Sequence, residues 1–141
     1  MRAPRSRRSD DGALRTAAAP HINQQFIALA DIAAFAALAL ARPDDYRGKT
    51  LELVGDVLTP PQVAAEISAA AGHRVPYIQR PIEELRRINE RFAQGYEWLN
   101  KGDGSIPYVD VHELRGLHPD LMTIRTWLNR TGARMLRPLL G

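Results

Sequence analysis

The most apolar stretch of the chain covers residues 26–43, with the sequence FIALADIAAFAALALARP. Its first part carries bulky side chains, which are typical of a short buried strand, whereas the part after Asp31 is mostly Ala and Leu, the best helix formers. Asp31 lies between the two parts and is suited to an N-cap. A membrane-spanning helix needs about 20 consecutive apolar residues, and this run has a charge inside it. The pattern therefore predicts a strand, a cap at Asp31 and a buried helix, and it excludes a membrane span.

Short strands alternate with helices along much of the chain. The expected strands cover 26–30, 51–55 and 74–79. Pro76 favours an edge position for the third strand, because proline has no N–H to donate to a neighbouring strand. Strands that alternate with helices predict parallel pairing through right-handed crossovers. The expected fold class is therefore α/β, with three short strands alternating with helices, followed by a helical C-terminal lobe.

The expected helices carry start and stop signals. One helix begins with Thr59 as its N-cap, has two prolines in its first turn and ends at Gly72. The later helices are expected at 81–102, 111–117 and 120–132. Gly95 indicates a bend in the first of these, Asp110 is a cap for the second, and Gly132 is a stop for the third.

The first 21 residues lack apolar periodicity and are rich in Arg, Ser, Asp and Ala, so they predict a disordered, arginine-rich tail. Residues 1–15 hold five arginines and two aspartates, which accounts for the whole net charge of +3. A nucleic-acid-binding domain needs a basic stripe on its folded part, and we expect no nucleic-acid partner here. The alternative, binding through this tail, predicts salt-sensitive affinity that is lost on deleting residues 1–15.

The sequence contains no complete catalytic, metal or nucleotide motif. It has no cysteine, no glycine-rich dinucleotide turn, no P-loop and no serine in a nucleophile elbow, and its four histidines lack metal-ligand spacing. Gly102-Asp103-Gly104 follows a helix and lacks a third glycine, so it indicates a flexible loop. We therefore expect no catalytic residue, metal ligand or cofactor-binding residue in this chain. The absence of cysteine fits the reducing cytoplasm, which is the expected location.

A series of small motifs follows one another from residue 22 to residue 130. An apolar strand ends in Asp-Ile, an Ala-rich helix follows, and Pro and an aromatic precede Gly-Lys. Then come L-x-G-D-x-L-T, an Ala-rich helix ending in Gly, V-x-Y before Pro, E-W-L, D-x-x-x-L-R and a final W-L. In this order and spacing the chain resembles the C-terminal part of the NmrA-like proteins, atypical members of the short-chain dehydrogenase/reductase superfamily.

The resemblance implies a function that depends on residues outside this sequence. NmrA-like proteins bind NAD(P) through an N-terminal Rossmann domain, and they include NADPH-dependent reductases and redox sensors that bind partners. Residues 22–141 would be the substrate-side part of such a domain, without its glycine-rich dinucleotide-binding half. We therefore expect a C-terminal fragment of an NAD(P)-dependent oxidoreductase or redox sensor, inactive alone and without a cofactor of its own. Intact relatives would transfer hydride between nicotinamide and a small carbonyl or quinone-like substrate.

Five side chains are candidates for lining the substrate pocket of this lobe. Tyr77 follows a short strand, where ligand sites of α/β proteins tend to lie. Phe92, Tyr96 and Trp98 lie on the long helix that follows, and His112 lies in the later helical region. Aromatic side chains also dominate ordinary cores, so a purely structural role remains the alternative for each of them.

A second interpretation is a non-catalytic interaction or dimerisation module derived from the same fold. A fragment would leave strands 26–30 and 51–55 without their neighbours, with unpaired backbone and an apolar face. It would therefore self-associate, or bind a missing Rossmann half. A monodisperse monomer that melts cooperatively would instead favour the independent module.

Overall fold

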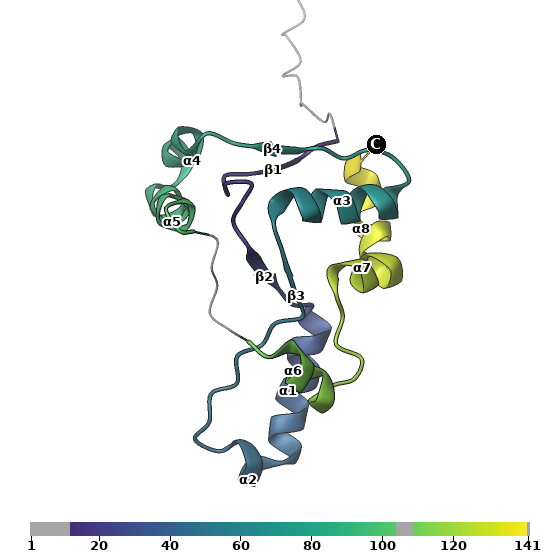
Figure 1. Cartoon of the computed structure of the whole chain (residues 1–141). Helices are drawn as coiled ribbons and strands as arrows, with labels where there is room; N and C mark the ends of the chain where they lie inside the picture. Colours follow the sequence, from purple (N-terminus) through teal and green to yellow (C-terminus); the bar gives the residue numbers. More distant parts are fainter. Residues whose placement is uncertain (1–11, 104–108, 141) are drawn as a thin grey trace, which may run out of the picture.

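The computed structural model describes residues 12–103 and 109–140, in which short strands alternate with helices (Figure 1). The strands are β1 (Leu14–Thr16), β2 (Gln24–Phe26), β3 (Asp56–Leu58) and β4 (Tyr77–Gln79). The helices are α1 (Leu29–Ala41), α2 (Pro43–Tyr46), α3 (Pro60–Ala71), α4 (Ile82–Ile88), α5 (Glu90–Asn100), α6 (Val111–Leu117), α7 (Ile124–Trp127), the π-helical turn η1 (Leu128–Gly132) and α8 (Ala133–Leu140). The expected α/β class with a helical C-terminal region is confirmed. Among these helices none has the length and apolar character needed to cross a bilayer.

The strands of the described ranges form two separate pairs. β1 and β4 are parallel, with Leu14 opposite Tyr77, whereas β2 and β3 are antiparallel, with Gln24 opposite Leu58. The prediction of parallel pairing is therefore right for one pair and wrong for the other. The predicted strand 51–55 is also wrong, because the pairing begins only at Asp56; residues 51–54 have no strand beside them among the described residues.

The strand predicted at 26–30 lies earlier, at β2, and the helix after it begins at Leu29. Asp31 is therefore not the N-cap, a position that Ala28 occupies without a side-chain hydrogen bond. The Asp31 side chain is buried instead, and it accepts hydrogen bonds from the ring Nε2 of His118 and the backbone N–H of Met122, each at 2.9 Å. The carboxylate that the local pattern predicts as a helix cap therefore binds His118, which lies more than 80 residues away in the sequence.

The disordered tail predicted for residues 1–21 is wrong for its second half. Residues 14–16 form β1, and Ala17 and Ala18 are completely buried, whereas residues 1–11 lie outside the described ranges. The N–H of Leu14 donates to the carbonyl of Pro76 at 2.9 Å, and the N–H of Arg80 donates to the carbonyl of Thr16 at 2.7 Å. The partner strand lies about 60 residues away, which is why the local composition did not reveal it.

Helix α3 agrees closely with its prediction. Thr59 and Gln62 form a capping box, in which Gln62 Oε1 accepts from the Thr59 N–H at 2.8 Å. Gly72 ends the helix in the left-handed conformation, with φ of +75°.

Two other helices differ from their predictions. The long helix expected at 81–102 is divided into α4 and α5 at Asn89 and not at Gly95, because the Asn89 side chain accepts from the N–H groups of Arg91 and Phe92 and starts a new helix. The last helix begins at Ile124 and continues past Gly132 to Leu140. Gly132 is not a stop, because it lies within a π-helical turn close against the Trp127 ring.

A cluster of buried side chains joins α1 to α6. Phe35 of α1, Leu114 of α6 and Leu121 form its centre, and Ile27 and Leu53 pack beside them. Figure 1 shows α1 and α6 side by side at one end of the molecule, away from α4 and α5. Only Asp31 and Phe35 of α1 are buried, so the expectation that this apolar helix is covered on all sides is wrong for the described residues.

Candidate ligand-binding groove

The β1–β4 pair forms the base of the candidate site. The Tyr77 hydroxyl lies 3.0 Å from Thr16 Oγ1 and contacts the backbone carbonyls of Thr16 and Ala18. Burial raises the pKa of this hydroxyl, and the hydrogen bond with Thr16 opposes that rise only partly. Tyr77 therefore stays protonated at neutral pH and acts as a donor that holds the chain in place after β1.

The two helices after β4 form a hairpin that faces this base. Arg86 of α4 pairs with Glu83 at 3.3 Å, with Glu90 at the start of α5, and with Glu97 further along α5. Asn100, the last residue of α5, then ties the hairpin to the base. Its side chain donates to the carbonyl of Ala17 at 2.8 Å and accepts from the N–H of Ala19 at 2.7 Å.

Two adjoining hollows of about 210 and 200 Å³ lie along the hairpin, and together they are called the α4–α5 groove here. Phe92 and Tyr96 of α5 line both hollows. The first hollow also has apolar walls from Leu85 and Ile88, and Leu99 lines the second. Phe92 and Ile88 are 64% and 76% exposed, so the apolar walls of the groove are open to solvent.

The polar rim of the groove is cationic. Arg15, Arg80 and Arg91 line it, and Asn89 adds an amide at the break between the helices. The guanidinium of Arg80 is 3.2 Å from the Glu84 carboxylate, an exposed pair of small strength. Apolar walls with guanidinium donors at the rim suit a flat, apolar molecule that carries oxygen atoms.

The five predicted pocket residues are not brought together at one site. Phe92 and Tyr96 are brought together in the groove, whereas Tyr77 lines neither hollow and turns its hydroxyl to the backbone of Thr16, which lines the first. Trp98 is 79% exposed on α5 and lines neither hollow, and His112 is exposed on α6. Figure 1 shows α6 beside α1 and distant from α5.

Sequence reasoning missed the rim residues. Arg15 lies in the segment predicted as a disordered tail, and Arg80 lies between the predicted strand 74–79 and the helix predicted to begin at Pro81. Asn89 carried a usable signal, since an asparagine followed by an acidic residue is a typical helix start. Ile88 at the end of α4 and Phe92 on α5 line the same hollow.

The described residues do not fit the phosphates of a dinucleotide. Such a site needs a glycine-rich turn that opens a helix and presents free N–H groups. Helix α1 opens on Ala28 with the Asp31 carboxylate in its first turn, and α3 opens on two prolines, which lack N–H groups. Among the described residues there is also no cluster of three metal-binding side chains.

Several solved structures share this fold. NmrA, described as a negative transcriptional regulator, matches as its NAD complex with a TM-score of 0.67 and 18% identity, over 91% of this chain and 46% of that chain. Its NADP complex matches with a TM-score of 0.66 and 17% identity, over the same shares. A nucleoside-diphosphate-sugar epimerase from Staphylococcus aureus matches with a TM-score of 0.63 and 20% identity, over 82% of this chain and 43% of that chain.

The chain thus spans less than half the length of these structures, and identities this low show the fold alone. No curated protein matches the sequence. The sequence model of the NmrA-like family matches residues 3–128, which begins inside the segment predicted as a tail and covers most of the chain. The protein therefore belongs to the NmrA-like family.

Proposed function

We propose that this chain is the substrate-side lobe of an NmrA-like NAD(P)-dependent oxidoreductase or redox sensor of the cytoplasm. The main support for this proposal is the α4–α5 groove, which combines the Phe92 and Tyr96 side chains with the guanidinium groups of Arg15 and Arg80. In this proposal the groove binds a small carbonyl or quinone-like compound. The dinucleotide is held by residues other than those described here, and the lobe is inactive without them.

The groove residues suit such a substrate for two separate reasons. An aromatic face of Tyr96 or Phe92 stacks on a planar ring and removes apolar area from water. A guanidinium N–H from the rim donates to a carbonyl oxygen and stabilises the negative charge that develops there on reduction. The base below, held by Tyr77 and Asn100, keeps the rim in position relative to the walls.

The groove is tested by titrating the purified chain with 1,4-naphthoquinone and following amide chemical shifts. Tyr96→Ala is expected to weaken binding about tenfold, because it removes an aromatic wall of both hollows. Trp98→Ala is the matched control, since it removes an aromatic of the same helix that lines neither hollow. Equal losses in the two variants would place the quinone elsewhere and contradict the proposal.

The dependence on another half is tested with the cofactor itself. Calorimetric titration of the chain with NADPH and NADH is expected to show no binding up to about 1 mM, since the described helix starts offer no phosphate cradle. Micromolar binding of either dinucleotide would contradict the proposal that the cofactor is held by other residues. The quinone titration tests the groove separately.

A second candidate function is a non-catalytic interaction or dimerisation module, and the exposed apolar face of α1 separates it from the lobe, because a lobe that lacks its other half leaves such a face without a partner. Leu29 and Leu40 are 83% and 82% exposed, and Ile32 is 40% exposed. Sedimentation velocity separates the two functions. Self-association that the double change Leu29→Gln and Leu40→Gln abolishes indicates a face that needs a partner, as in the lobe. A wild-type monomer with a cooperative melt favours the independent module.

A further inference from the structure

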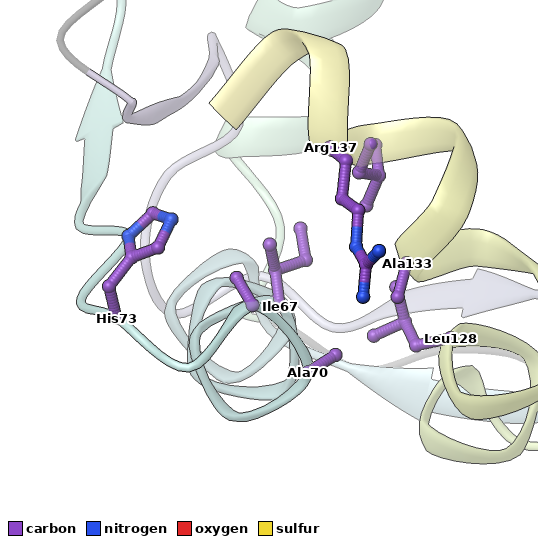
Figure 2. Close-up of a pocket in the computed structure, with 8 residues that line it drawn as sticks. Ile67, Ala70, His73, Leu128, Ala133 and Arg137 are labelled. Carbon is purple, nitrogen blue, oxygen red and sulfur yellow. The ribbon is translucent and has the colours of Figure 1, made fainter. Parts of the chain in front are cut away.

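A separate pocket of about 140 Å³ lies between α3 and the last helices, and it is called the α3–α8 pocket here (Figure 2). Its floor is aliphatic, with Ile67 from α3, Leu128 from η1 and Leu136 from α8. Two polar side chains, His73 and Arg137, line it as well. Figure 2 shows them on opposite sides of Ile67, with the Arg137 guanidinium turned from α8 toward the floor.

Arg137 differs from the arginines that stabilise the fold. Arg125 makes a bidentate pair with Glu66 at 2.8 and 2.9 Å, and Arg86 joins three glutamates. Within residues 12–103 and 109–140 no carboxylate or carbonyl accepts from the Arg137 side chain. A guanidinium that faces an aliphatic floor without an acceptor is a ready partner for a carboxylate, which it can bind through two parallel N–H groups.

The pocket is independent of the α4–α5 groove. The two share no lining residue, and the wall formed by Ala133 and Arg137 lies after residue 128, where the match to the family ends. The volume is small beside the range of about 300–1,000 Å³ for pockets that hold drug-sized ligands. It therefore suits a chain of a few carbon atoms and excludes a nucleotide or a large ring system.

We propose that the α3–α8 pocket binds a short aliphatic carboxylate. The hydrocarbon tail lies on Ile67 and Leu128, and the carboxylate accepts hydrogen bonds from the Arg137 guanidinium. His73 supplies a ring nitrogen at the other side of the opening. A free short-chain acid and the C-terminal residue of an aliphatic peptide share this chemistry, and the two sources are separated below.

Hexanoate titrated into the full chain, followed by amide chemical shifts, tests this site. Binding is expected at about millimolar concentration, as for other ligands of this size, with the largest shifts at residues around Ile67 and Ala133. Hexylamine has the same tail and the opposite charge, and acetate has the charge without the tail, so neither is expected to shift these residues. An N-acetylated peptide that ends in leucine tests the second source, and binding tighter than that of hexanoate would assign the site to peptide ends.

Two substitutions test the two halves of the site. Arg137→Gln is expected to weaken hexanoate binding about tenfold, whereas Arg134→Gln, an exposed change on the same helix, leaves it unaltered. Ala70→Leu fills the pocket and is expected to abolish binding, whereas Ala65→Leu, exposed on the same helix, does not. Unchanged affinity in Arg137→Gln or in Ala70→Leu would overturn the proposal. Far-UV circular dichroism confirms that each variant is folded, and hexylamine binding equal to that of hexanoate would also overturn it.

Discussion

Helices α1 and α3 have similar lengths and are both rich in alanine, yet they differ in capping and in burial. Helix α3 begins with a capping box, ends at a left-handed glycine and buries Ala64 at 3% exposure. Helix α1 is the more apolar of the two, but it has no side-chain cap and leaves Leu29 83% exposed.

The difference shows that apolar composition by itself does not bury a helix. Helix α3 is amphipathic, and its single apolar face is covered by α7, η1 and α8. Helix α1 is apolar on nearly every side, and only the side that holds Asp31 and Phe35 has a partner among the described residues. Full burial of one leucine side chain stabilises a protein by about 1.5–3 kcal/mol, so a partner that covered the exposed face of α1 would stabilise the protein strongly.

The same substitution in the two helices gives the largest expected effect. Ala64→Glu in α3 is expected to lower the free energy of unfolding by about 3 kcal/mol or more, because it forces a charge into a closely packed site. Ala37→Glu in α1 is expected to change it by less than about 0.5 kcal/mol, because that position is exposed. Urea unfolding measures both.

A loss of several kcal/mol in Ala37→Glu would contradict the comparison, because it would mean that α1 is already covered in the purified chain. Repeating the measurement across a range of protein concentrations separates the two ways to cover it. A loss that grows with concentration indicates a second copy on α1, since the stability of an assembly depends on the protomer concentration.

The helix starts sharpen the comparison with smaller effects of opposite sign. Thr59→Ala is expected to lower the free energy of unfolding by about 1 kcal/mol, because it removes half of the α3 capping box. Ala28→Ser is expected to raise it by about 0.5 kcal/mol, because Ala28 has the extended backbone of an N-cap and no capping side chain. Thermal unfolding at one fixed pH measures both changes. If both variants changed the stability in the same direction, the difference in capping between α1 and α3 would be contradicted.

The smallest effect concerns the ion pair of α3 with α7. The hydrogen bond from Arg125 lowers the pKa of Glu66, and partial burial opposes this only in part. A lowered pKa in the folded state adds stability above the ordinary pKa of glutamate, and the stability is lost as the pH falls through the folded value. Glu66→Gln is therefore expected to cost about 0.5 kcal/mol at pH 7, since Arg125 is largely exposed, and nothing in strong acid.

Urea unfolding at several pH values measures this difference. The exposed Glu52→Gln is the control and should show no such trend. A cost of Glu66→Gln that persists in strong acid would show that shape, and not charge, makes the contribution.

The sequence by itself determined the features that depend on neighbouring residues. The start and end of α3, the Asp110 cap of α6 and the ordered motifs of the NmrA-like family lie within short windows of the chain. Capping and turn chemistry act over three or four residues, so a local pattern is sufficient for them. Phe92 and Tyr96 lie one helical turn apart, so a local pattern also places them on one face of α5, where both line the groove.

Only the tertiary structure decided what depends on distant partners. Residues 14–16 form a strand and not a tail, because they pair with β4. Asp31 bonds to His118 and does not cap a helix, and one predicted helix is divided at Asn89. The tertiary structure also decided that α1, the most apolar segment of the chain, is mostly exposed. Strand pairing, burial and pocket formation each depend on which surfaces meet after folding. The sequence pattern shows how apolar a helix face is, but it does not show which segment covers that face.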